Sequence, residues 1–280
     1  MFLLKSTFDV DNLLNKHRNE NKKIGFVATM GALHKGHISL NERSKRENDT
    51  TVCSIFVNPR QFNETKDLEN YPRPIENDIK VLIDAGCDLL FLPGADDIYP
   101  VNYSAPEIDL LSVAGILEGA SRPGHFKGVA IVVKRLFDCV KPDKAYFGQK
   151  DYQQTLVIKQ IIKQFYLPIE IVISEIVRED TGLAMSSRNI RLSEEHRNKA
   201  GFIYKTLLQL KSDVKNMPLH EAIEKAKAQI LKNEETILEY LEVTDPETLM
   251  PLNAIPINGQ VLALVVVNYF GVRLLDNIFL

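Results

Sequence analysis

Residues 24–47 read IGFVATMGALHKGHISLNERSKRE, and this stretch decides the fold. Its first part, residues 24–29, is a short apolar run of the kind that forms a buried strand. Glycines at positions 31 and 36 then interrupt the pattern, and residues 37–47 follow with helical character. A strand, a glycine turn and a helix in this order predict part of a βαβ unit, in which helices join parallel strands.

The same alternation continues along the chain. Further short apolar runs predict strands at 51–57, 88–92, 144–147 and 169–173. The segments between them predict helices at 74–85, 127–140 and 149–165, from apolar residues at helical spacing and from a Pro at the start and a Gly at the end of 74–85. The pattern indicates an α/β domain whose parallel sheet is covered on both faces.

The character of the sequence changes after about Val177. Helical patterns at 194–210 and 219–231 are followed by strand patterns at 237–243, 260–268 and 272–280. Helices followed by consecutive strands predict a second, smaller α+β domain.

Composition excludes several classes of protein. The chain has 280 residues, of which 45% are apolar and 25% are charged, as in an ordinary globular protein. A net charge of −3 provides no chain-wide basic field for nucleic acid or for an anionic membrane. No apolar stretch reaches the ~18–20 residues that span a bilayer, and Met1 to Val10 lacks a signal-peptide layout. With Cys53, Cys87 and Cys139 in or beside apolar runs, we expect a cytoplasmic protein with reduced, buried thiols.

The glycine turn after the first strand has the features of a phosphate-binding corner. Gly31 and Gly36 allow the backbone to turn sharply and to approach a ligand closely. A helix that begins near Gly36 presents unpaired N–H groups and a partial positive charge to an anion. His34 and His37 add donors beside those amides. Two other interpretations remain open, a chance pair of surface histidines and half of a zinc site.

Two further loops offer donors for anions. Phe147-Gly148-Gln149-Lys150-Asp151 again ends a strand and begins a helix, although a Lys-Asp pair in this position is often simple capping. Met185-Ser186-Ser187-Arg188-Asn189 combines two hydroxyls with a guanidinium, although it also suits a solvated loop between domains. Because both loops follow strands of the predicted sheet, we expect them to gather with the first turn around one ligand.

Two amides and one carboxylate complete the set of candidates. Gln61 follows the second predicted strand and Gln154 lies near the start of a helix, where an amide can bind a carboxylate or hydroxyl without adding charge. Asp78, in the first turn of a predicted helix, is a candidate to reach a magnesium ion held by phosphates.

The motifs together resemble the pantoate–β-alanine ligase (pantothenate synthetase) family, within the HIGH-type nucleotidyltransferases. The resemblance covers essentially the whole chain and rests on six strings in the family order. They are Thr29-Met30-Gly31-Ala32-Leu33-His34-x-Gly36-His37, Ser54-Ile55-Phe56-Val57-Asn58-Pro59-x-Gln61-Phe62, Tyr71-Pro72-Arg73, Arg122-Pro123-Gly124-His125-Phe126-x-Gly128-Val129, Phe147-Gly148-x-Lys150-Asp151-Tyr152-Gln153-Gln154 and Met185-Ser186-Ser187-Arg188-Asn189.

The resemblance implies a Rossmann-like domain at 1–176 that binds ATP and pantoate, a lid domain at 177–280, and a homodimer. It implies that pantoate, β-alanine and ATP give pantothenate, AMP and pyrophosphate, with Mg²⁺. The charge balance, by itself, argues against nucleic acid or membrane partners. By motif position, His37, His34, Lys150 and Arg188 would carry the catalysis, Gln61 and Gln154 would bind substrate, and Asp78 would bind metal. The ATP site would comprise Met30, Gly31, Ala32, Leu33, His34, Lys35, Gly36, His37, Gly148, Gln149, Lys150, Asp151, Val177, Met185, Ser186, Ser187 and Arg188.

The chain departs from the family pattern at two places. Ala28 stands where the family often has Pro, which loosens the turn without removing a functional group. Asn77-Asp78 stands where some members have an acidic pair, so that only Asp78 can supply a carboxylate. Three alternatives stay open: another HIGH-type adenylyltransferase, an RNA-binding relative of the aminoacyl-tRNA synthetases, and a nucleotide sensor without catalysis.

Overall fold

The computed structural model describes residues 1–62, 68–110 and 112–280. The chain forms two compact units. Unit 1 comprises Met1–Gly148 and Gln153–Ser174, and unit 2 comprises Gln149–Tyr152 and Glu175–Leu280. Each unit has its own hydrophobic core and is described by itself.

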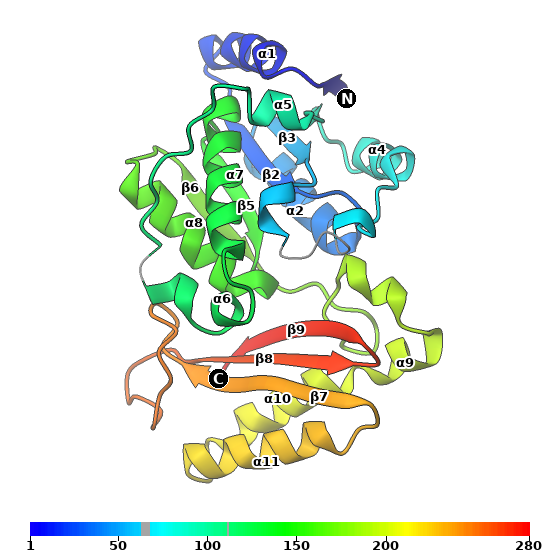
Figure 1. Cartoon of the computed structure of the whole chain (residues 1–280), viewed down its shortest axis with the longest axis vertical. Helices are drawn as coiled ribbons and strands as arrows, with labels where there is room; N and C mark the ends of the chain where they lie inside the picture. The colour runs from blue at the N-terminus through cyan, green and yellow to red at the C-terminus, as the bar shows by residue number, and fades with distance from the viewer. Residues whose placement is uncertain (63–67, 111) are drawn as a thin grey trace. The chain divides into compact units, whose positions relative to one another are not determined.

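The described residues of unit 1 contain a six-stranded sheet in the order β1-β4-β3-β2-β5-β6, and every neighbouring pair is parallel (Figure 1). The strands are β1 (Phe2–Leu4), β2 (Ile24–Thr29), β3 (Thr50–Ile55), β4 (Leu89–Phe91), β5 (Lys144–Gly148) and β6 (Glu170–Ser174). Because all pairs are parallel, the strands end at the same edge of the sheet, where α/β proteins place their ligand sites.

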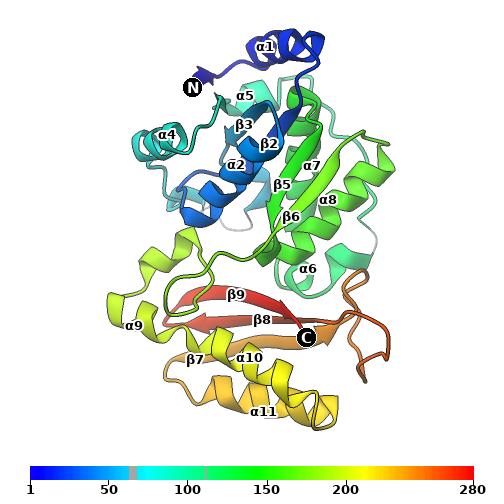
Figure 2. The ribbon, with the colours of Figure 1, turned by 180° about the vertical axis from the view of Figure 1, so that it is seen from behind.

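Helices cover both faces of this sheet, and alternate strand residues point to each side. On one face, Phe26 packs with α1 (Thr7–Asn19), α7 (His125–Val140) and α8 (Tyr152–Gln164). On the other face, its neighbour Val27 packs with α2 (Lys35–Glu47) and α4 (Ile75–Asp84). Figure 1 shows α7 in front of the sheet, and Figure 2 shows α2 in front of it from behind. The short helices are α5 (Ala95–Ile98), α6 (Glu118–Ser121), and the 3₁₀ turns η1 (Pro59–Gln61) and η2 (Ser112–Gly115).

Unit 2 combines an antiparallel sheet in the order β7-β8-β9 with helices packed on it (Figure 2). Its strands are β7 (Thr236–Thr244), β8 (Leu262–Tyr269) and β9 (Val272–Phe279). The core lies between this sheet and the helices α10 (Phe202–Asp213) and α11 (Leu219–Leu231). The remaining elements are α9 (Glu194–Lys199) and the 3₁₀ turns η3 (Gln149–Asp151) and η4 (Ser187–Arg191).

The predicted class, a parallel α/β sheet followed by a smaller α+β part, is confirmed. One predicted helix, 194–210, is wrong in detail, because it is divided into α9 and α10. The division falls at Gly201, where the carbonyl of Thr181 approaches so closely that a Cβ would collide with it. Neither β1 nor α1 was predicted.

The three cysteines are buried and free, as predicted. Within the described ranges, no helix combines the length and the apolar character that crossing a bilayer requires.

Candidate active site

The turn between β2 and α2 carries the residues 30–37. Gly31 has φ +82° and Ala32 has φ +50°, so the chain turns through the left-handed region at two consecutive residues. Thr29 fixes the start of this turn, because its hydroxyl donates to the carbonyl of Ser54 (2.8 Å) and accepts the N–H of Gly31 (3.2 Å). The non-glycine residue in this conformation indicates that the surrounding structure holds the turn in place.

Asp78 on α4 holds the other side of the same turn. Its Oδ2 accepts the N–H of Ala32 and its Oδ1 accepts the N–H of Leu33, both at 2.8 Å. Asp78 is completely buried. The carboxylate therefore forms two charge-assisted hydrogen bonds to the backbone of the predicted phosphate-binding turn.

The two histidines cap the start of α2. Nδ1 of His34 accepts the N–H of Gly36 (3.1 Å), and Nδ1 of His37 accepts the N–H of His34 (3.3 Å). A neutral imidazole that accepts at Nδ1 carries its proton on Nε2. The rings lie together, with 4.1 Å between their centroids. Each histidine can therefore present an Nε2–H donor beside the N-terminus of a helix.

Gln61 lies in η1, directly after β3, and is buried. Its side-chain nitrogen contacts the sulfur of Met30, and its Oε1 accepts from Nδ2 of Asn58 (3.3 Å). Its own carbonyl accepts from Nδ1 of His125 (2.8 Å). Unit 1 thus brings Gln61 to the start of the 30–37 turn.

The neighbouring amides Gln153 and Gln154 have different environments. Gln153 is buried, and its amide accepts the N–H of Glu118 (3.1 Å) and donates to the carbonyls of Val113 and Ile116. It therefore holds the segment before α6. Gln154, the third residue of α8, is only half-buried.

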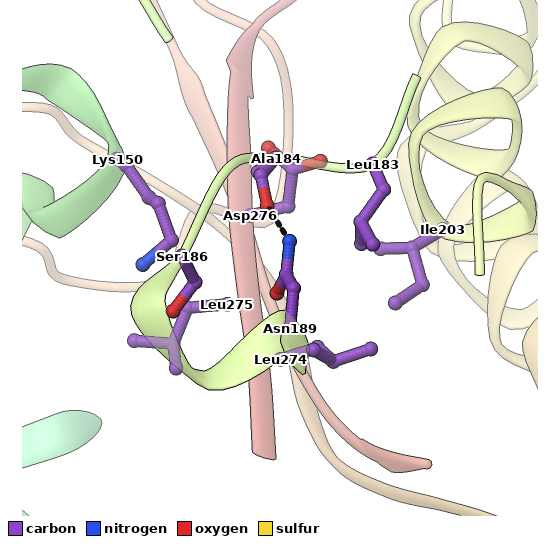
Figure 3. A pocket seen from close by; sticks show the side chains of 9 residues that line it. All are labelled: Lys150, Leu183, Ala184, Ser186, Asn189, Ile203, Leu274, Leu275 and Asp276. Carbon is purple, nitrogen blue, oxygen red and sulfur yellow. Dashed lines mark hydrogen bonds between the residues drawn. The ribbon is translucent and has the colours of Figure 1, made fainter. Parts of the chain in front are cut away.

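In unit 2, the Lys150 turn and the loop 185–188 lie on one small cavity of about 10 Å³. Lys150, Ser186, Asn189 and Asp276 are among its lining residues, as Figure 3 shows. Oδ1 of Asn189 is buried and has no hydrogen-bond partner among the residues that the structure describes. The volume suits one water molecule, which such an unpaired oxygen would bind. Two of the segments predicted to bind ATP therefore come together within unit 2.

The loop 177–188 has a defined conformation. The N–H of Met185 donates to the carbonyl of Val177 (3.0 Å), and Arg178 pairs with Ala184 in an antiparallel bridge. Oγ of Ser186 accepts the N–H of Arg188 (3.2 Å) at the start of η4. Nδ2 of Asn189 donates to the carbonyl of Ala184 (3.1 Å), which closes the loop at its base. Asn189 belongs to the motif quoted from the sequence, which assigned it no role.

The predicted residues are thus divided between the units. Unit 1 contains residues 30–37, Gln61, Asp78, Gly148 at the end of β5, and Gln154. Unit 2 contains the remaining ATP-site candidates, Gln149, Lys150, Asp151, Val177, Met185, Ser186, Ser187 and Arg188. Asp276 and Asn277 on β9 were missed by sequence reasoning, because no motif marked them.

The residues around Asp78 do not form a magnesium site of their own. Both oxygens of the carboxylate already accept backbone hydrogen bonds. Among the described residues, no three or more His, Cys, Asp or Glu side chains are grouped so that they could hold a metal ion. Mg²⁺ needs near-octahedral oxygen ligands, which these residues alone do not provide, so we derive no step through a protein-held ion. The metal role of Asp78 stays a prediction.

Comparison with known proteins gives a consistent result. The family model for pantoate-beta-alanine ligase matches residues 3–279. A pantothenate synthetase from Cytophaga hutchinsonii is 44% identical over 267 residues, which cover 95% of this chain and 94% of that protein. One from Fervidobacterium nodosum is 40% identical over 281 residues, covering 100% and 99%.

Solved structures agree with these matches. The pantothenate synthetase from Thermus thermophilus superimposes with a TM-score of 0.92 at 39% identity and covers 99% of both chains. The pantoate-beta-alanine ligase from Francisella tularensis, solved with beta-gamma ATP and beta-alanine, has a TM-score of 0.81 at 37% identity, covering 100% of this chain and 97% of that one. Since the family model and these relatives align with nearly the whole length of the chain, the chain belongs to the pantoate–β-alanine ligase family.

Proposed function

We propose that this chain condenses pantoate with β-alanine to form pantothenate, while ATP is converted to AMP and pyrophosphate. The family match over residues 3–279 carries this proposal. Two segments that the sequence predicts to bind phosphate support it through their defined conformations, namely the 30–37 turn in unit 1 and the Lys150 turn with the 185–188 loop in unit 2. In this proposal, residues 1–176 bind ATP and pantoate, and residues 177–280 act as a lid. The enzyme is a cytoplasmic homodimer, and sedimentation equilibrium at micromolar concentration tests the dimer.

In the first step, a carboxylate oxygen of pantoate attacks the α-phosphorus of ATP. A new P–O bond forms pantoyl adenylate, while the bond to the β-phosphate breaks and pyrophosphate leaves. Negative charge grows on the phosphate oxygens, so donors that are already in place stabilise the transition state. Nε2–H of His34 and His37, the N-terminus of α2, Lys150 and Arg188 supply these donors, and Nε2–H of His37 donates a hydrogen bond to the leaving pyrophosphate.

In the second step, the neutral amine of β-alanine attacks the carbonyl carbon of pantoyl adenylate. The C–N bond forms, the nitrogen loses a proton to solvent, the bond between the carbonyl carbon and the phosphate oxygen breaks, and AMP leaves. Gln61 and Gln154 hold the pantoyl group through this step, with Gln61 also bordering β-alanine. Because the mixed anhydride hydrolyses easily, closure of residues 177–280 over it protects the intermediate from water.

Magnesium enters as part of the Mg·ATP substrate, where it neutralises phosphate charge. The histidines, Lys150 and Arg188 then act on the remaining charge at the phosphate oxygens.

The experiment that tests the function follows the two half-reactions separately. We expect pantoate-dependent exchange of labelled pyrophosphate into ATP, followed by β-alanine-dependent release of AMP. Another HIGH-type adenylyltransferase, the alternative left by the sequence, would show no dependence on pantoate. A nucleotide sensor would bind ATP without either reaction.

The roles of Lys150 and His37 are tested by substitution. Loss of one charge-stabilising donor lowers the rate by ~10²–10³, so Lys150→Ala and His37→Ala should each lose this much kcat with the fold intact. Lys159→Ala, on the exposed surface of α8, is the matched control and should keep its rate. Turnover near that of the wild type in either test variant would remove that residue from the proposed mechanism.

A further inference from the structure

Two adjacent residues of β9, Asp276 and Asn277, contact the Lys150 turn and Arg178 at the base of the 185–188 loop. β9 pairs with β8 along one side and has no second partner among the described strands. Both residues are buried, with 4% and 1% of their surfaces exposed. Successive residues of a strand point to opposite faces. Their two side chains therefore reach two different loops from one place in the sheet.

Asn277 binds the Lys150 turn through its whole amide. Its Nδ2 donates to the carbonyls of Gln149 and Lys150, at 3.0 Å each. Its Oδ1 accepts from Nε2 of Gln149, also at 3.0 Å. An amide is the group that can donate twice and accept once here, since a carboxylate would face the two carbonyl oxygens without a hydrogen atom to share. The chemistry of the contact therefore requires Asn at this position.

Asp276 binds the base of the other segment. Its carboxylate accepts from Nη1 and Nη2 of Arg178 at 2.6 and 2.8 Å, in a bidentate pair. The same guanidinium donates to the carbonyl of Gly182 (3.0 Å) and lies 3.5 Å from the centre of the Tyr204 ring. Arg178 is thus fixed on three sides.

Arg178 in turn helps to position the neighbouring residues that are predicted to contact ATP. Arg178 follows Val177 directly and pairs with Ala184 in the bridge that precedes Met185. Asp276 therefore holds the strand-like pair from which residues 185–188 extend. Oδ1 of Asp276 also accepts the N–H of Asn277 (2.8 Å), so the carboxylate and the amide are themselves joined.

We propose that Asp276 and Asn277 are positioning residues that fix the Lys150 turn relative to the 185–188 loop, so that both bind one triphosphate. This inference rests on the proposed function, since it concerns the ATP site of that reaction. In this proposal, neither side chain contacts substrate. They act through Gln149, Lys150 and Arg178, which lie 128, 127 and 98 residues away in the chain.

The test compares Asn277→Asp with Asn268→Asp, the same change at a half-buried position of the neighbouring strand β8. Loss of the hydrogen bonds to the Lys150 turn should raise KM for ATP about tenfold or more in Asn277→Asp and slow pyrophosphate exchange equally. KM for β-alanine should change less than twofold. Asn268→Asp should leave all of these constants within twofold of the wild type.

Asp276→Asn provides a second variant if Asn277→Asp does not fold, and it should raise KM for ATP in the same selective way. Arg178→Lys combined with Asp276→Asn should lose little more than either change alone, because the pair acts as a unit. An unchanged KM for ATP, or equal losses for ATP, pantoate and β-alanine, would overturn the inference. Absence of pantoate-dependent exchange in the wild type would instead overturn the proposed function.

Discussion

Replacing Asp78 with Asn should destabilise unit 1 and weaken ATP binding together. The change keeps the size of the side chain and removes its charge. One oxygen remains to accept a backbone N–H, whereas the other becomes an NH₂ group that faces an N–H donor of residue 32 or 33. A hydrogen bond to a charged group contributes about 1.5–3 kcal/mol, and a buried donor left unpaired costs about 1–3 kcal/mol. Removal of a buried charge offsets part of this, so we expect a loss of about 2–4 kcal/mol.

The loss has two measurable consequences. For a domain of 150–250 residues, each kcal/mol lowers Tm by about 2–4 °C, so Tm should fall by about 5–15 °C. The turn with Ala32 at φ +50° also loses part of what holds it, so KM for ATP should rise about tenfold or more. Glu76→Gln is the matched control, because Glu76 is an exposed acid in the same first turn of α4.

The assay also separates this role from the magnesium role predicted from the sequence. Calorimetry in EDTA measures Tm without metal, and a magnesium titration at fixed ATP measures the metal requirement. If Asp78 acts by holding the turn, Asp78→Asn lowers Tm in EDTA and leaves the magnesium requirement unchanged. An unchanged Tm with a markedly higher magnesium requirement would refute the structural role of Asp78 and support the metal role.

The other predictions concern the two neighbouring amides of α8, one glycine of α7 and the buried cysteines. Gln154→Ala should weaken pantoate binding in calorimetric titrations with little change in ATP binding; weaker ATP binding with unchanged pantoate binding would instead place Gln154 in the nucleotide site. Gln153→Ala should lower Tm, since Gln153 holds the segment before α6. Gly128→Ala should raise KM for pantoate about tenfold, because a Cβ there would collide with the carbonyl of Arg60 and overpacking costs about 1–3 kcal/mol beside Gln61; unchanged pantoate kinetics would contradict this. Burial raises the pKa of Cys87 to about 11 and also raises the pKa values of Cys53 and Cys139, so none of the three should react with Ellman's reagent at pH 8 before unfolding. The folded-state pKa of Cys87 lies above the ordinary value of 9.0, so the thiol ionises more easily in the unfolded chain. Its contribution to the free energy of unfolding is therefore fully present below pH 9.0 and is lost as pH rises through about 11, and Tm should fall over this range.

The sequence predicted most of the fold because strands such as β2 and β5 are buried on both sides and read as apolar runs. β1 escaped prediction because it has only three residues, and two of them, Phe2 and Leu3, are exposed at the edge of the sheet. α1 escaped because only Val10 and Leu14 of its thirteen residues are buried, which leaves too narrow an apolar stripe to recognise.

In the candidate site, too, local interactions could be predicted from the sequence and distant ones could not. The glycine turn could be predicted because its donors, Gly36 and the two histidines, lie within four residues of one another. The partners of Asp78 are 46 and 45 residues away, so nothing near Asp78 in the sequence revealed that its oxygens bind the turn. Asp276 and Asn277 were missed for the same reason, since a strand near the C-terminus has no local pattern that points to Arg178 or Gln149.

These distant contacts also bear on Ala28, which stands where the family often has Pro. A proline stiffens a turn by restricting the backbone before it is folded. Here the turn is held from both ends after folding, by the Thr29 hydroxyl at Gly31 and by the Asp78 carboxylate at Ala32 and Leu33. Its conformation therefore depends on a buried carboxylate from another helix, which makes the turn more sensitive to Asp78 than to residue 28. In this chain, Asp78→Asn should damage ATP binding more than Ala28→Pro would improve it.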